Sequence, residues 1–250
     1  MSAEGQDSSI DLYWLPLGAG GSFVRWNGRL FEAVTARREH RAAQDLYHCA
    51  LEVHQQGSRF VIEMAPVWNI DAADRGVVCE GPVGTRWLGR SRLFRYEVRF
   101  WRDGRIPDVA EAVASPQRVS NDKPQVALLL EILPSVPTLT WGRDVLRSGD
   151  MWNSNSLTSW LLARTGHDMA TISPPTRGRA PGWHAGLVHA GRPAKEQPRT
   201  ETQANAKYPE QLNSSTHWPD TAREVDARVT TFREHDDPVA GRSSLPEVPR

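Results

Sequence analysis

The chain has 250 residues, and its 30 Lys and Arg residues balance 30 Asp and Glu residues, so the formal net charge is zero. This balance argues against a dedicated nucleic-acid binder, which usually carries a basic surplus. No apolar run reaches the roughly 18 residues of a transmembrane helix. Two cysteines, Cys49 and Cys79, are too few for a disulfide framework or a Cys-based zinc site.

Hydrophobic residues make up 39% of the chain, below the roughly 45–50% of an ordinary globular domain. The shortfall lies after residue 190, where sixty residues contain only seven Val, Leu and Phe but seven prolines. Such a segment buries too little apolar surface to offset the entropy of ordering. We therefore predict a disordered start (1–9), one folded domain (10–190) and a disordered tail (191–250). The polar start lacks the features of a secretory signal, which favours a cytoplasmic protein.

The first half of the domain reads mainly as strands. A strand over 12–17 leads into a glycine-rich loop at 18–21, and Asn27-Gly28 predicts a hairpin between two aromatic runs. A helix is expected over 32–43, and a second hairpin over 46–54 and 59–65. Short strands follow at 76–80 and at 93–101, where Tyr96 and Val98 alternate with Glu97 and Arg99.

Helical patterns dominate the second half. We expect helices over 107–114, 124–133 and 153–165, the second with a proline in its first turn and the third ended by Gly166. An irregular loop at 178–183 and a last short strand at 186–190 complete the domain. Strands followed by helices indicate an α+β fold with a mostly antiparallel sheet.

His48 is the first candidate catalytic residue, because a polar ring inside a strand calls for an explanation. A turn centred on Gln56 and Gly57 makes facing residue numbers sum to 113, so Ala50 faces Glu63 and Glu63 becomes a diagonal neighbour of His48. A carboxylate beside an imidazole sets its tautomer and raises its basicity. The alternative is a structural histidine near a surface glutamate, and a one-residue slip in register would separate the pair.

Ser154 is the second candidate, within the polar run 153–156 that opens a predicted helix. Ser and Asn are favoured helix caps, which accounts for part of this run. A nucleophile at a helix N-terminus could also use the dipole and the free backbone N–H groups as an oxyanion site. Ser156 lies one turn deeper and is the weaker candidate.

These residues resemble the circularly permuted NlpC-type papain-like superfamily, which includes the lecithin:retinol acyltransferase-like proteins. Tyr47-His48-Cys49-Ala50-Leu51 is similar to the histidine strand of that superfamily, and Phe60-Val61-Ile62-Glu63 to the strand of the third polar residue. Asn153-Ser154-Asn155-Ser156-Leu157 is similar to the helix start that holds the nucleophile. The resemblance implies a permuted papain-like fold, with Ser154 as nucleophile, His48 as base and Glu63 as its orienting partner.

The departure from the family is the nucleophile itself, because the family has cysteine where this chain has Ser154. A helix terminus can lower the pKa of a thiol into the working range, whereas a serine must pass its proton to a base during attack. The Ser–His–Glu reading predicts a hydrolase or acyltransferase acting on an amide, ester or thioester. The alternative is an inactive domain that binds a peptide, a lipid-like ligand or a protein partner, and an unrelated scaffold without a site is a third reading.

No metal or cofactor is expected from the sequence. His54, His184 and His189 have no His, Asp or Glu partner at ligand spacing. Cys49 is adjacent to His48 in the strand and so faces the other way. Asp144 and Arg179 either line a cleft or hold loops.

Overall fold

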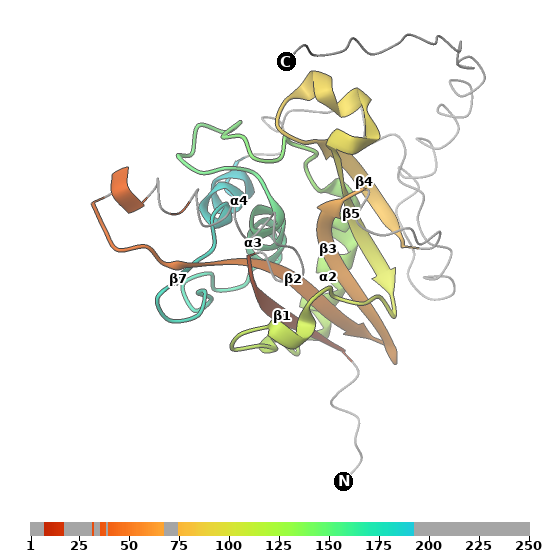
Figure 1. Ribbon diagram of the computed structural model, residues 1–250. Helices are drawn as coiled ribbons and strands as arrows, with labels where there is room; N and C mark the ends of the chain where they lie inside the picture. Colours follow the sequence, from red (N-terminus) through yellow and green to blue (C-terminus); the bar gives the residue numbers. More distant parts are fainter. Residues whose placement is uncertain (1–7, 18–31, 33–35, 39, 68–74, 193–250) are drawn as a thin grey trace, which may run out of the picture.

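The computed structural model describes residues 8–17, 32, 36–38, 40–67 and 75–192. Within them the chain has an α+β fold with a mostly antiparallel sheet (Figure 1), as the sequence predicts. The glycine-rich loop at 18–21, the hairpin around Asn27-Gly28, residues 1–7 and the tail after residue 192 lie outside the described residues. Of the helix predicted over 32–43, residues 32 and 36–38 are helical.

The main sheet joins strands from both ends of the domain. A two-residue strand, β7 (Gly178–Arg179), adds parallel pairing to one end of β2. The other strand pairs in the described part of the chain are antiparallel. In sheet order the main strands are β4 (Val77–Pro82), β5 (Arg95–Arg102), β3 (Ser58–Pro66), β2 (Asp45–Gln55), β1 (Ser8–Pro16) and β6 (Gln117–Ser120).

The hairpin between β2 and β3 has the predicted register. Each facing pair from Gln55–Ser58 to Leu51–Ile62 sums to 113. Gln56 and Gly57 both have positive φ, 50° and 75°, which is the backbone of the tight turns that match the twist of paired strands. Local turn chemistry therefore sets the register.

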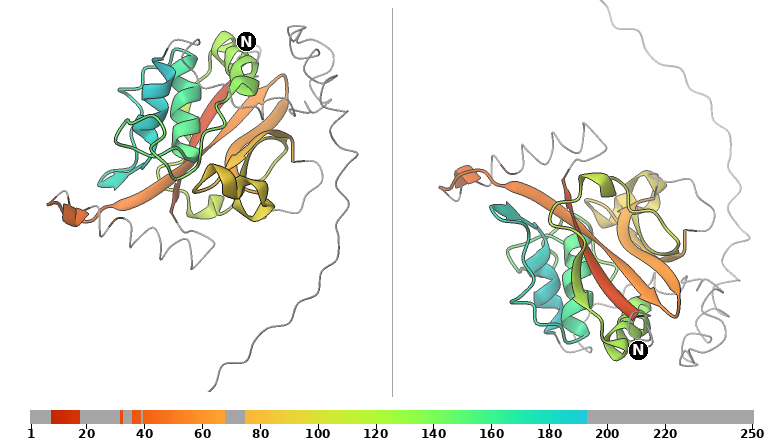
Figure 2. Two further views of the ribbon diagram at one scale, coloured as in Figure 1. Left: turned by 90° about the horizontal axis from the view of Figure 1, so that it is seen from above. Right: turned by 90° about the horizontal axis from the view of Figure 1, so that it is seen from below.

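Three α-helices pack on one face of the sheet (Figure 2). They are α2 (Lys123–Ile132), α3 (Ser154–Arg164) and α4 (Trp183–Ala190). Their apolar side chains form one core with Trp14 of β1 and Leu51 of β2. A smaller cluster on the opposite face contains Leu15, Ala50, Val61 and Ile106. No helix among the described residues is long and apolar enough to cross a bilayer.

Several elements differ from the sequence prediction. β1 begins at Ser8, inside the start predicted to be disordered, and β6 lies where no strand is predicted. The strand expected over 186–190 is the helix α4, and the helix expected over 107–114 is a single 3-10 turn, η3 (Val109–Glu111). A short apolar run has no period long enough to separate helix from strand. The helix forms because α4 packs closely on α3, where Ser159 Oγ donates to the Trp183 carbonyl at 2.8 Å.

Gly186 makes this close approach possible. A Cβ at residue 186 would overlap the Ser159 hydroxyl and the Ser156 carbonyl, and the backbone carbonyl cannot swing aside. We predict that Gly186→Ala destabilises the protein by about 1–3 kcal/mol, because overpacking a close helix contact forces the helices apart. Chemical denaturation measures the change.

Gly191→Ala is the matched control, since a Cβ there would meet its nearest neighbour at an ordinary 3.8 Å. Equal losses in both variants would contradict the close packing of α3 on α4.

Candidate functional site

The polar run that opens α3 is largely used to cap the helix. Asn153 is the N-cap residue, and its Oδ1 accepts hydrogen bonds from the backbone N–H groups of Asn155 (2.9 Å) and Ser156 (3.3 Å). In return, Ser156 Oγ accepts from the Asn153 N–H at 3.0 Å. This reciprocal arrangement is a capping box. Ser156 is fully buried and is committed to the cap rather than to chemistry.

Asn155 ties α3 to the sheet. Its side-chain amide donates to the carbonyl oxygens of Tyr47 (2.9 Å) and Pro181 (2.8 Å), and its Oδ1 accepts from Cys49 Sγ at 3.0 Å. Tyr47 and Cys49 therefore lie on the face of β2 that the helix covers. Burial raises the pKa of the Cys49 thiol to about 12, so this cysteine is not a nucleophile at neutral pH.

Among the described residues, Ser154 has no capping or tying bond, unlike the other members of the run. It opens α3, as the sequence predicts, and its side chain is buried. The Ser154 hydroxyl therefore lies at the positive end of the helix dipole, on the covered face of the sheet.

His48 lies on the opposite face. Successive side chains of a strand alternate, so His48 points away from the face that holds Tyr47 and Cys49. Its facing residue in β1 is Leu15, a member of the smaller cluster on the far face. Burial lowers the pKa of His48 to about 4, and the nearby Asp108 carboxylate opposes that shift. The imidazole is neutral at physiological pH but has no path to Ser154 through the sheet.

Glu63 is engaged elsewhere. Its carboxylate accepts from Arg99 Nη1 at 2.8 Å, and Arg99 also pairs with Glu97 through Nε at 2.5 Å. Burial raises the pKa of Glu63, and the Arg99 charge counteracts this rise. Arg75 provides a second cation for Glu97. Among the described residues no hydrogen bond or ion pair joins Glu63 to His48.

The structure thus does not bring the three predicted catalytic residues together. The strand alternation correctly placed Cys49 and His48 on opposite faces, but the sequence could not show which face meets α3. The side chain that meets the helix is Cys49. The residue types of a Ser–His–Glu site are present, whereas the central sheet separates the serine from the other two.

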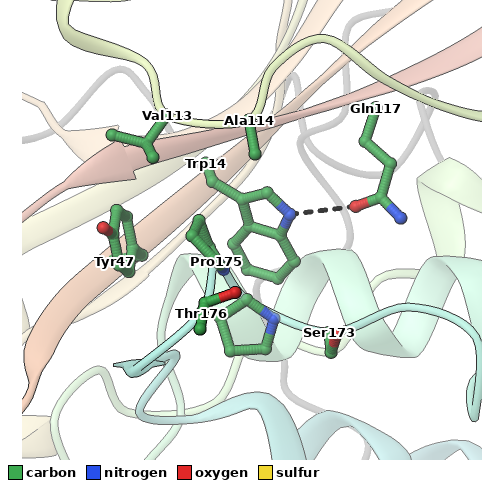
Figure 3. A pocket seen from close by; sticks show the side chains of 9 residues that line it. Trp14, Tyr47, Val113, Ala114, Gln117, Ser173, Pro175 and Thr176 are labelled. Atoms are coloured by element: carbon green, nitrogen blue, oxygen red, sulfur yellow. Dashed lines mark hydrogen bonds between the residues drawn. The ribbon is translucent and has the colours of Figure 1, made fainter.

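A pocket on the covered face was not anticipated from the sequence. It has a volume of about 590 Å³, and none of its lining residues is charged. Figure 3 shows the Trp14 indole among the lining side chains, with its Nε1–H donating to Gln117 Oε1 at 3.0 Å. The lining residues are Trp14, Tyr47, Val113, Ala114, Gln117, Ser173, Pro174, Pro175 and Thr176.

Four separate segments build this pocket, which explains why no local motif marks it. Trp14 and Tyr47 come from β1 and β2, and segments around 113–117 and 173–176 close it. The Ser115 hydroxyl accepts from the Trp14 N–H at 2.8 Å, and the Trp14 carbonyl accepts from the Val113 N–H. These bonds hold the 113–117 segment against the edge of β1.

A cluster of ligand-type side chains occupies another part of the sheet. Asp11, Glu52 and His54 place one ligand atom each within 4.8 Å of one another, so the expectation that His54 lacks such partners is wrong. The facing of Asp11 and Glu52 across β1 and β2 creates the cluster. Both carboxylates are already neutralised, Asp11 by Arg118 (2.6 Å) and Glu52 by Arg59 (2.7 Å). The arrangement is an ion-pair network.

The remaining polar candidates hold loops. Asp144 accepts from the backbone N–H groups of Ser148 and Gly149 at 2.8 and 2.9 Å, which lowers the pKa of Asp144. Arg179 lies 3.6 Å from Glu32.

Comparisons with protein families, curated proteins and solved structures gave no match to this chain.

His189 is fully buried, and its ring lies near the rings of Trp152 (5.8 Å) and Trp160 (6.5 Å). Neither ring nitrogen has a hydrogen-bond partner among the described residues. Burial lowers the pKa of His189 to about 4, so it stays neutral in the folded protein.

Acid should destabilise the protein through these two histidines. In the unfolded chain an imidazole gains its proton near pH 6.5, whereas folded His48 and His189 gain theirs only near pH 4. The unfolded state therefore binds up to two more protons between these values, and stability falls as pH drops from about 6.5 to 4. Urea unfolding at a series of pH values measures the slope of the unfolding free energy against pH.

His189→Phe should remove one of the two protons and so reduce the slope of the unfolding free energy against pH. His184→Gln, at an exposed position, should leave this slope unchanged. A slope unaffected by His189→Phe would contradict the burial of a neutral ring.

Proposed function

We propose that this chain is a non-catalytic binding domain that takes an uncharged peptide segment in the Trp14–Tyr47 pocket. The observation that carries the proposal is the separation of Ser154 from His48 and Glu63 by the sheet. A serine hydroxyl needs a base within hydrogen-bond reach to act as a nucleophile, and α3 faces Cys49 instead of His48.

We propose that this chain shares the fold of the permuted NlpC-type papain-like superfamily but not its catalytic activity. It is supported by the chain order of the histidine strand β2, the neighbouring strand β3 and then a helix that opens on Asn153-Ser154. It is also supported by the packing of that helix on β2. We propose a papain-like fold in which the catalytic pairing has been lost.

The lining of the pocket supports an uncharged ligand of peptide character. Trp14, Tyr47 and two prolines provide apolar surface, while Ser173 and Thr176 provide hydroxyl groups. Gln117 uses its Oε1 to accept from Trp14, which leaves its Nε2 donors for a ligand carbonyl. A charged ligand would lose its hydration here without a compensating partner.

Catalysis is tested with a fluorophosphonate probe, which labels activated serines. We expect wild type and Ser154→Ala to show the same background labelling, because Ser154 lacks a base. An active serine hydrolase confirms that the probe works. Labelling that disappears in Ser154→Ala would overturn the non-catalytic assignment.

Binding is tested with a pool of short uncharged peptides, observed by NMR through the Trp14 indole N–H, whose signal is assigned with Trp14→Phe. We expect this signal to shift on titration. Gln117→Glu keeps an acceptor for Trp14 but replaces the amide donor, so it should weaken binding about tenfold, the value of one hydrogen bond.

Gln125→Glu adds the same charge on α2, outside the pocket, and should bind normally. Peptide binding that leaves the Trp14 signal in place, or equal weakening in both variants, would remove the pocket as the binding site.

A further inference from the structure

The connection between β4 and β5 carries an unusual surface. It consists of two 3-10 turns, η1 (Arg86–Arg90) and η2 (Arg92–Phe94), and it projects beyond the sheet as the yellow segment at the top of Figure 1. We call residues 86–94 the tip. None of its side chains is fully buried. No acidic residue occurs between Glu80 and Glu97.

Large apolar side chains are exposed on the tip. Trp87 is 71% exposed, Leu93 62% and Phe94 36%. Single exposed apolar residues are common on any surface, but several gathered on one projecting segment mark an interaction site. Trp87 and Leu93 keep most of their surface exposed in the folded chain, so this surface is free for a partner.

The charge of the tip has one sign. Arg86, Arg90 and Arg92 are exposed, and within the described ranges no carboxylate pairs with them. Arg95, just beyond the tip, differs: it donates to the Gly89 carbonyl at 2.6 Å and pairs with Glu80 at 3.1 Å. This inner arginine holds the backbone of the turns and leaves the three outer ones to a partner.

We propose that the tip binds the surface of an anionic lipid bilayer. Trp87, Leu93 and Phe94 would enter the interfacial layer, where aromatic and aliphatic side chains are stabilised, and the three arginines would meet lipid phosphates. A protein partner would need a separate pocket for each protruding side chain, whereas a bilayer accepts them without preformed shape. Arginine stems also lie easily along apolar surface with their charge at the headgroups.

This surface is separate from the Trp14–Tyr47 pocket, whose lining includes no residue of the tip. The proposal therefore stands independently of the proposed peptide binding. Because each arginine near an anionic surface contributes about a fivefold factor in partitioning, three of them should have a large and salt-dependent effect.

Vesicle co-sedimentation of the full chain tests the proposal. Vesicles of phosphatidylcholine alone are compared with vesicles containing about one third phosphatidylglycerol, at low and at high salt. We expect binding to the anionic vesicles, with at least a tenfold loss in the variant Arg86→Gln/Arg90→Gln/Arg92→Gln. Trp87→Ala/Leu93→Ala should also lose at least tenfold, including at low salt.

The matched control is Arg37→Gln/Arg38→Gln/Arg105→Gln, which removes the same charge from exposed positions elsewhere and should bind normally. The proposal would be overturned if the wild type did not bind anionic vesicles, or if the control variant lost as much vesicle binding as the tip variant. Soluble polyglutamate is the second ligand. If the wild type binds polyglutamate as tightly as it binds anionic vesicles, and this binding does not depend on Trp87, the tip would be assigned to acidic polypeptides instead.

Discussion

The side-chain amide of Asn155 joins the first turn of α3 to β2, and much of the structure depends on this link. Through its bonds to Tyr47 and Cys49 it determines which face of the strand the helix covers. Because side chains alternate along a strand, the same link sends His48 to the far face. One buried amide therefore decides that the nucleophile position and the histidine lie on different sides of the sheet.

The burial of α3 explains why its first turn is so polar. The first N–H groups of any helix lack partners within the helix, and on a protein surface water satisfies them. Residues 154–162 of α3 are all buried, so the chain must supply the partners itself. Asn153 and Ser156 do this as a capping box, with a contribution of about 1 kcal/mol per cap. Burial thus accounts for Asn153 and Ser156 in a run that resembles a catalytic motif, and Ser154 remains without a capping role.

The buried charged residues on the far side of the sheet also depend on partners that the chain itself supplies. The pattern of β5 correctly separates Tyr96 and Val98 from Glu97 and Arg99, but it does not show whether the charged face is buried. Glu97 and Arg99 are instead fully buried and survive there because Arg99 neutralises both Glu97 and Glu63. Removing Arg99 alone would leave the buried Glu63 carboxylate without a cation, while Glu97 would keep Arg75. An uncompensated buried charge is far costlier than replacing the whole group.

The sequence by itself determined what depends on near neighbours. The Gln56-Gly57 turn set the register of β2 against β3, the Asn153 cap and Gly166 marked the ends of α3, and alternation placed His48 opposite Cys49. Only the tertiary structure decided which of those two meets α3, that residues 186–190 form a helix, and that Trp14, Tyr47 and Gln117 share a pocket. The physical reason is that alternation is a local property with two equivalent outcomes. The contact that chooses between them joins residues 106 positions apart, Cys49 and Asn155.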